Sequence, residues 1–283
     1  MLFRSDYVDL HVHSNASDGT CTPTEVVGLA ARAGLKAIAL TDHDTTAGIP
    51  EALLAGAACG VEVIPSIEVS SSYKGHEIHI LGLFVTAGNP GLESVLKKFR
   101  QGRDQRNEEM FRRFAKDGII FTPEELHGGN PDTVITRAHV ARALLSKGMG
   151  SSLDQIFKRY LQYDGPYCPP KAYVAADEVL DALLSCGAFP ALAHPFQYKL
   201  GDKGTMELAA YLASLGMKGL EVYHSSNNRL ESMKLQEIAA ACRLLPTGGS
   251  DFHGSNKPDI SIGRGRGGLR VSCLLLEDIK KAL

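Results

Sequence analysis

Length, composition and charge exclude several classes of protein before any motif is considered. The chain has 283 residues, 44% of them hydrophobic, which is enough for one large domain or two small ones with a buried core. A formal net charge of −2 argues against a protein that coats nucleic acid non-specifically, although a local basic pocket stays compatible with it. The six cysteines include no CxxC pair, no signal peptide precedes the first strand, and no apolar run reaches about 18 residues. We therefore expect a cytoplasmic protein with reduced thiols, no membrane span and no obligate protein partner.

Strands and helices alternate along most of the chain. Thr22 or Thr24 can cap the first helix, which is expected to end at Gly34. Strand-like apolar segments occupy residues 7–13, 35–44, 61–71, 76–85, 189–196, 218–224 and 244–253. Helical segments between most of these strands favour a parallel sheet, and seven such strands are close to the eight of a TIM barrel. The predicted fold class is therefore α/β, with a TIM-like barrel.

A helical, highly charged segment interrupts this alternation after Leu92. The pattern predicts helices up to about residue 168, where a proline-rich stretch precedes the return of alternating strands and helices. We therefore expect a barrel in two parts, residues 1–98 and 169–283, separated by an all-helical insertion domain at 99–168.

Polar side chains collect near one end of the apolar strands. Residues i and i+2 of a strand share a face, so His11 and His13 project side by side, and Asp251 and His253 repeat the arrangement. Two surface histidines on an edge strand would be the ordinary explanation of the first pair alone. The other strands, however, carry or end in Asp42, His43, Glu68, His79, His194 and His224. Because barrel active sites form at the carboxyl ends of the strands, we interpret these residues as one convergent metal site.

Spacing refines the set of candidates. His76 and His79 differ by three positions, so a regular strand points only one of them inward. We choose His79, which lies deeper in the apolar run. Asp18 follows the first strand in a loop, within reach of the mouth of the barrel.

Five fragments in a fixed order resemble a known family. They are "DLHVHSNASDG", "LTDHDT", "IE" followed by "HILG", "AHP" and "GSDFHG", and the series is similar to that of the PHP (polymerase and histidinol phosphatase) family. The likeness covers residues 6–85 and 170–255. The fragment "TRAHVARALLSKG" resembles the helical insert of the branch that contains nucleotide-bisphosphate phosphatases and 5′–3′ exoribonucleases. The loop "YHSSNN" departs from the usual "YHP", so the substrate is where the likeness carries over least safely.

The resemblance implies a distorted (β/α)7 barrel, a metal-dependent phosphoesterase activity and a set of metal ligands. The implied ligands are His11, His13, Asp18, His43, Glu68, His79, His194, Asp251 and His253. The family pattern implies a first ion on His11, His13, Glu68 and Asp251. It implies a second ion on Glu68, His79 and His194, and a third on Asp18, His43 and His253, so that Glu68 bridges the first two.

The chemistry of this donor set limits the metal. Imidazoles and carboxylates without a thiolate suit Mn²⁺, Fe²⁺ or Zn²⁺, and of these we expect Mn²⁺. The donors are too many for one ion, so we expect two or three. Ions about 3.5–4 Å apart generate hydroxide and stabilise the attacking and leaving oxygens of a displacement at phosphorus.

Candidate substrate and proton-transfer residues surround the metal site. Arg137 can grip phosphate oxygens bidentately, with His139 beside it; a solvated surface arginine is the plain alternative, and the resemblance favours the first. Lys171, Asn227 and Asn228 are further candidates for substrate contacts. His224 is the candidate general acid or else a substrate contact, and Asp42 either orients an imidazole or caps a helix.

Within the branch that the chain resembles, a nucleoside 3′,5′-bisphosphate fits two separated anion sites, with a nucleoside 5′-monophosphate as the product. The nearest alternatives are 5′–3′ digestion of short RNA and hydrolysis of a histidinol-phosphate-type ester. An amidohydrolase also begins with H-x-H but usually needs a bridging lysine or glutamate where this chain has His79. A catalytically inactive, nucleotide-binding module is the alternative from a different class.

Overall fold

One mixed sheet forms the centre of the molecule. The computed structural model describes residues 6–127, 133–162, 165–169 and 173–283. Within them the sheet has eight strands in the order β7-β6-β5-β4-β3-β2-β1-β8. The strands are β1 (Tyr7–Val12), β2 (Ala37–Leu40), β3 (Glu62–Tyr73), β4 (His76–Leu83), β5 (Phe189–Leu192), β6 (Gly219–His224), β7 (Leu245–Gly249) and β8 (Val271–Ser272).

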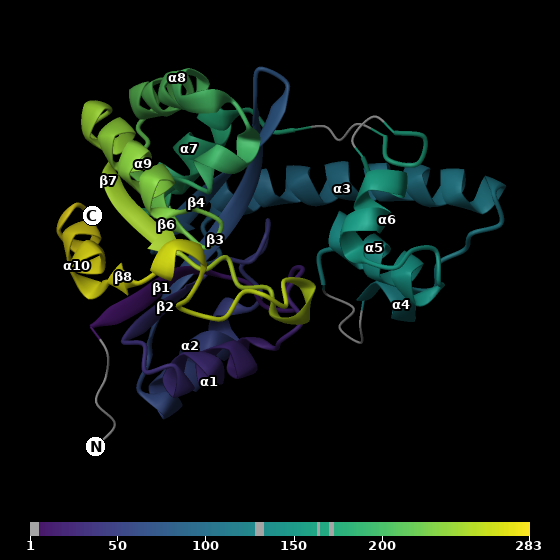
Figure 1. Ribbon diagram of the computed structural model, residues 1–283, viewed down its shortest axis with the longest axis horizontal. Coiled ribbons are helices and arrows are strands. Elements are labelled where there is room, and N and C mark those ends of the chain that lie inside the picture. The colour runs from purple at the N-terminus through teal and green to yellow at the C-terminus, as the bar shows by residue number, and fades with distance from the viewer. Residues whose placement is uncertain (1–5, 128–132, 163–164, 170–172) are drawn as a thin grey trace.

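Helices surround this sheet and extend to one side of it (Figure 1). The α-helices are α1 (Pro23–Arg32), α2 (Ile49–Cys59), α3 (Pro90–Lys116), α4 (Pro123–His127), α5 (Arg137–Ser146), α6 (Leu153–Tyr160), α7 (Ala176–Ser185), α8 (Gly201–Ser214), α9 (Arg229–Ala241) and α10 (Cys273–Lys281). The short 3₁₀ turns are η1 (Pro195–Tyr198), η2 (Gly254–Asn256) and η3 (Arg266–Gly268). Among the described residues, none of the helices has both the length and the apolar composition needed to cross a membrane.

The first helix begins as its sequence predicts. Thr22 is the N-cap of α1, its hydroxyl accepts from the amide of Glu25, and the Glu25 carboxylate accepts in turn from the amide of Thr22. This reciprocal pair satisfies two of the amides that a helix start leaves unpaired. Of the two proposed caps, Thr22 rather than Thr24 is therefore used.

The sheet nearly closes between β1 and the segment that follows β7. The amide of Asp251 donates to the carbonyl of His11 at 2.8 Å, and the amide of His13 donates to that of Phe252 at 2.9 Å. Gly249 permits this approach, because a Cβ there would lie 2.3 Å from the Cβ of His11. The two polar motifs of the first and last barrel strands are thus joined through their backbones.

Six of the seven expected strands form parallel pairs, and β4 between them is antiparallel. β1, β2 and β3 are parallel, as are β5, β6 and β7, but β4 is antiparallel to β3 and β5. Tyr73 pairs with His76 across a two-residue turn, Lys74–Gly75, in which both residues have positive φ. Such turns match the twist of a tight hairpin. His79 therefore reaches the site from the middle of an antiparallel strand and not from a carboxyl end, and β8 is an eighth, antiparallel strand that the sequence did not predict.

The helices at the side of the barrel have an apolar cluster of their own. Met110 and Phe114 of α3 pack there with Val140 and Leu144 of α5 and Ile156 of α6. This separate core supports our proposal that residues 99–168 form an insertion domain. The expected boundary between barrel and insertion, at residue 99, falls inside α3, and this helix runs unbroken from the barrel into the insertion (Figure 1).

Candidate metal centre

The carboxylate of Glu68 lies at the centre of the site. It is 1% exposed and sits in the middle of β3. Its two oxygens have imidazole nitrogens at 2.9–3.3 Å from His11, His13, His43, His79 and His194. A carboxylate buried without charge compensation would be costly, so this arrangement requires positive charge around it.

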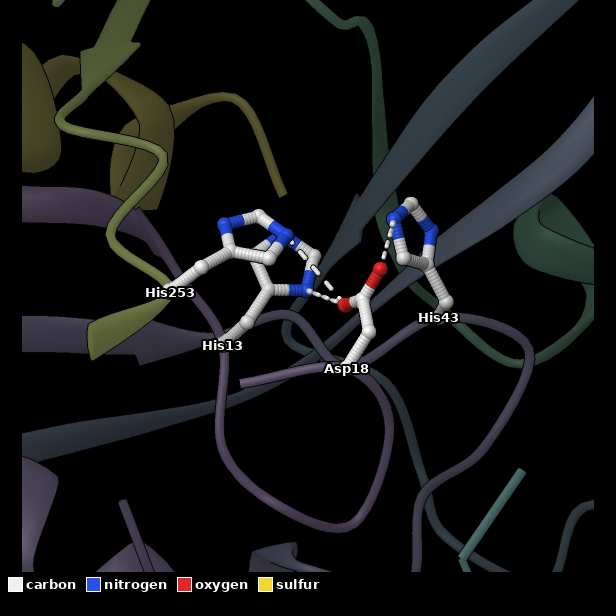
Figure 2. Close-up of side chains that lie close together, drawn as sticks. All are labelled: His13, Asp18, His43 and His253. Atoms are coloured by element: carbon white, nitrogen blue, oxygen red, sulfur yellow. Dashed lines mark ion pairs between the residues drawn. The ribbon is translucent and has the colours of Figure 1, made fainter. Parts of the chain in front are cut away.

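A second group of donors surrounds Asp18, in the loop after β1. One carboxylate oxygen lies 3.2 Å from Nε2 of His253 and 3.8 Å from Nδ1 of His13. The other lies 3.8 Å from Nε2 of His43. Figure 2 shows the carboxylate of Asp18 pointing between these three rings. Asp18 therefore faces the same space as the imidazoles around Glu68.

The two carboxylate oxygens of Asp251 face different neighbours. Oδ1 lies 3.3–3.6 Å from ring nitrogens of His11, His13 and His253. Oδ2 accepts from Nζ of Lys257 and lies 3.3 Å from Nε2 of His224. One oxygen thus faces three imidazoles, while the other is shared by Lys257 and His224.

Buried polar atoms without partners show that this cluster fits metal ions. Within the described part of the chain, atoms of His13, Asp18, His43, Glu68 and His194 are buried and lack a hydrogen-bond partner. Such atoms are rare in folded proteins unless an ion or water satisfies them. Among the residues that the structure describes, four groups have donor atoms within 4.8 Å of one another: His13–Asp18–His43–His253, His11–His224–Asp251, His11–Glu68–His194 and His43–Glu68–His79. These His, Asp and Glu clusters are able to bind metals, and Glu68 belongs to two of them.

Burial and the neighbouring charges shift the pKa values of the groups in the cluster. Burial by itself lowers the pKa of His13, but bonds to Asp251 and Glu68 outweigh it and raise the pKa to about 9. Burial by itself raises the pKa of Glu68, but the surrounding imidazoles hold it well below its ordinary range. His43 differs, because burial dominates and lowers its pKa to about 3. Protons and divalent ions therefore compete for the same donors.

Two buried carboxylates that the sequence analysis missed hold the ligand-bearing segments. Glu221 accepts from Nδ1 of His11 at 2.9 Å and from the backbone amide of His194 at 2.6 Å. Asp9 accepts from the amide and hydroxyl of Ser250 and from the amide of Gly263. Each is an acidic residue inside an otherwise apolar strand, a pattern that could have identified them because such a charge needs buried partners.

Asp42, which precedes His43, supports the loop after β1. The carboxylate of Asp42 accepts from the amide and hydroxyl of Ser14 and from the hydroxyl of Ser17. It neither orients an imidazole nor caps α2, whose N-cap is Gly48, so both roles expected for Asp42 are corrected. The carboxylate of Asp42 is instead occupied by hydroxyl and amide donors from the loop after β1, which is the loop that carries Asp18.

Two of the proposed ligands have a strained backbone. His194 has φ 26° and Asp251 has φ 56°, a region that residues other than glycine seldom adopt. The amide of His194 is held by Glu221, and the amide of Asp251 by the carbonyl of His11. Conformations that cost about 1–3 kcal/mol persist only where surrounding contacts fix them. With this backbone conformation, both side chains point into the cluster.

One cavity of about 480 Å³ connects the cluster to the insertion. Its metal-side wall includes Asp18, His43, Glu68, His79, His194, Asp251 and His253. Its opposite wall consists of residues from the β3–β4 hairpin and the insertion: Ser70, Glu77, Arg103, Arg106, Thr136, Arg137, Ala138, Leu153 and Phe157. A volume of this size suits a small ligand. Residues far apart in the sequence thus share a single binding space.

Arg137 lines this cavity, as its proposed role requires. Its Nη1 donates to the carbonyl of Leu161 at 3.2 Å, and its Nη2 lies 3.9 Å from a carboxylate oxygen of Glu77. His139 does not share that position. It is buried, and its Nδ1 accepts from the amide of Thr136 in the capping box of α5, so it stabilises the start of the helix that carries Arg137.

The other candidates for substrate contacts and proton transfer have mostly structural partners. Asn227 is buried and donates to the carbonyl of Val222, and Asn228 is the N-cap of α9. Polar groups at a strand-to-helix turn satisfy the backbone first, which explains both corrections. Lys171 lies outside the described residues. His224 is 2% exposed and its Nε2 lies 3.3 Å from Oδ2 of Asp251, and its role as general acid or substrate contact stays a prediction.

Several cavity residues were not found from the sequence. Arg103 and Arg106 lie on α3, Glu77 on β4 and Lys257 after β7. On their own they look like ordinary surface charges, because charged residues on a long polar helix are usually solvated. Only the packing of the insertion against the barrel shows that Arg103 and Arg106 are buried.

Imidazoles and carboxylates meet at one cavity whose far wall carries arginines, a combination suited to holding divalent ions against a phosphate ester. The class that this fold and site define is a metal-dependent hydrolase of phosphoester bonds. The PHP domain family matches residues 9–185, more than half of the chain, and the chain belongs to that family.

Curated relatives and solved structures resemble nearly the whole chain. A 3′,5′-nucleoside bisphosphate phosphatase of Chromobacterium violaceum is 32% identical over 90% of this chain and 90% of its own. A 5′-3′ exoribonuclease of Haemophilus influenzae is 33% identical over 87% and 89%. A phosphoribosyl 1,2-cyclic phosphate 1,2-diphosphodiesterase of Eggerthella lenta is 33% identical over 87% and 94%. A solved structure from Chromobacterium violaceum, described as an amidohydrolase with bound sulfate, superposes with a TM-score of 0.87 at 29% identity, over 97% and 96%.

We expect the metal-stripped protein to lose stability as the pH rises from about 6.5 to 9.5. The raised pKa of His13 means that its protonated ring stabilises the fold fully below its ordinary pKa of 6.5, and that this contribution disappears as the pH passes through 9. The shift corresponds to about 3 kcal/mol. Calorimetric unfolding at several pH values measures it. The Mn²⁺-loaded protein is the control and should lack this fall, because the ion replaces the proton; the same fall in both forms would contradict the assignment.

Proposed function

We propose that this protein hydrolyses the 3′-phosphate of a nucleoside 3′,5′-bisphosphate and releases a nucleoside 5′-monophosphate. The observation that carries the proposal is the single cavity with metal-binding donors on one wall and insertion arginines on the other. Two separated anion sites suit a small scaffold with two phosphates. The relative named as a 3′,5′-nucleoside bisphosphate phosphatase, alike over 90% of this chain, supports the same choice.

The proposed metal complement is two or three divalent ions, with Mn²⁺ as the expected metal. Bound ions of this kind supply an activated hydroxide and stabilise the attacking and leaving oxygens. The proposed ligands are His11, His13, Asp18, His43, Glu68, His79, His194, Asp251 and His253. Glu221 and Asp9 keep the ligand-bearing strands in place, and Lys257 donates to Oδ2 of Asp251.

We expect Glu68→Gln to lose more than one ion per chain, because Glu68 belongs to two donor groups. An amide side chain keeps the size of the carboxylate but offers one neutral oxygen where two charged ones stood. Elemental analysis after loading with Mn²⁺ and removal of the excess measures the change. Wild type should hold at least two ions, and Glu93→Gln on the exposed surface of α3 is the matched control. One ion or none in the wild type would contradict the proposal.

We expect Arg137→Ala to raise KM for adenosine 3′,5′-bisphosphate about 10-fold, the lower end of the range for a charge-assisted hydrogen bond. The effect stays at that end because Glu77 already compensates part of the charge of Arg137. Hydrolysis of 4-nitrophenyl phosphate, which has no second phosphate, should barely change. Steady-state kinetics on both esters measures this. An equal loss on both would indicate misfolding or a direct role at the reacting phosphate.

Nucleobase identity is expected to matter little. Leu153 and Phe157 of α6 form an apolar part of the cavity wall, which suits stacking rather than hydrogen-bonded reading of a base edge.

The main alternative function is 5′–3′ digestion of short RNA, which is favoured by the relatives named as exoribonucleases at 33% identity.

A comparison of three substrates tests the proposed substrate. We expect kcat/KM to be highest for adenosine 3′,5′-bisphosphate when it is compared with a 5′-phosphorylated oligoribonucleotide and histidinol phosphate, with Mn²⁺ present. Histidinol phosphate has only one phosphate for the two sites, and an oligoribonucleotide has further nucleotides that a cavity of about 480 Å³ leaves little room for. If the bisphosphate is the poorest of the three, the substrate assignment is wrong. Turnover of amides without phosphatase activity would instead favour an amidohydrolase.

A further inference from the structure

Arg106, on the inner face of α3, has a buried guanidinium with unused hydrogen-bonding capacity. The residue is 4% exposed and lines the cavity. Its Nε donates to Oδ1 of Asn107 at 2.9 Å, but its Nη2 has no partner among the described residues. A buried charged donor without a partner is destabilising unless something satisfies it.

The two neighbouring arginines, unlike Arg106, face carboxylates. Arg103 forms an ion pair with Asp44 and donates to the hydroxyl of Ser70. Arg137 lies 3.9 Å from Glu77. Arg106 forms no ion pair within the described parts of the chain. Burial and the nearby charges of Arg103 and Arg137 lower the pKa of Arg106 to about 10, which still leaves it protonated near neutral pH.

Arg106 is also held in a fixed direction beside the start of a helix. Nδ2 of Asn107 donates to the carbonyl of Ile135 at 3.2 Å, which ties the pair to the residue that precedes the N-cap of α5. That N-cap, Thr136, lines the cavity together with Ala138 in the first turn of this ten-residue helix. The amino end of a helix favours an anion, so the helix and the unpartnered guanidinium point to the same ligand charge.

We propose that Arg106 and the amino end of α5 form a second anion site, which binds a terminal phosphate and sets the preference for substrates with a 5′-phosphate. The proposal rests on the proposed function and deepens it. Arg106 is the principal cation of this site, and Arg137 contributes less because Glu77 faces it. A phosphate monoester is the ligand that fits, because it brings two negative charges and several acceptor oxygens to a planar guanidinium.

The test compares two substrates that differ only in the 5′-phosphate. Adenosine 3′,5′-bisphosphate and adenosine 3′-monophosphate are hydrolysed by the Mn²⁺-loaded wild type and by Arg106→Gln. We expect kcat/KM for the bisphosphate to fall about 10- to 150-fold, the range for a charge-assisted hydrogen bond, and to fall far less for the 3′-monophosphate. Arg112→Gln, an exposed position on the same helix, is the matched control and should behave like wild type.

Binding of the product gives a readout that does not depend on catalysis. Adenosine 5′-monophosphate carries only the 5′-phosphate, and calorimetric titration should give a Kd weakened about 10-fold or more by Arg106→Gln. Arg106→Lys keeps the charge but not the planar fork, so it should lie between wild type and Arg106→Gln. It also provides a folded variant if Arg106→Gln is unstable.

The outcomes separate this proposal from the proposed function. A wild type without preference for the bisphosphate over the 3′-monophosphate overturns the substrate assignment. The binding measurement then still decides the anion site, which is supported if Arg106→Gln weakens 5′-monophosphate binding. Unchanged product affinity in both Arg106 variants, or an equal loss of activity on both substrates, overturns the role of Arg106.

Discussion

Five imidazole rings surround the carboxylate of Glu68, and they come from four different strand regions. Buried in the middle of β3, this carboxylate cannot remain charged without positive partners. The first strand, the loop after β2, the antiparallel β4 and the end of β5 each bring a ring to it. Divalent ions satisfy such a cluster better than protons do, because one ion accepts several donors at once.

Buried carboxylates outside the ligand set keep the ligands where the cluster needs them. Asp9 of β1 holds the segment after β7, Glu221 of β6 holds His11 of β1, and Asp42 fixes the loop that carries Asp18. The left-handed backbones of His194 and Asp251 are held by hydrogen bonds to their amides. The geometry of the site therefore depends on three acidic residues that do not line the cavity.

The two walls of the cavity carry different kinds of side chain. The barrel wall presents the donors for metal ions, while the insertion wall presents arginines on α3 and α5. Relatives of nearly equal similarity carry names that refer to different phosphate esters. In this chain the insertion wall combines the charged Arg103, Arg106 and Arg137 with the apolar Leu153 and Phe157.

The sequence by itself determined the features that depend on neighbours along the chain. The i, i+2 spacing of His11 and His13, a threonine cap at Thr22 or Thr24, the alternation of strands and helices and the preference for His79 over His76 all follow from local geometry. The tertiary structure alone decided that β4 runs antiparallel, that Asp42 and His139 support loops and helix ends, and that Glu221 and Arg106 are buried beside the site. The physical reason is that these features depend on pairings between distant segments, such as His11 with Glu221, and no local periodicity encodes such a contact.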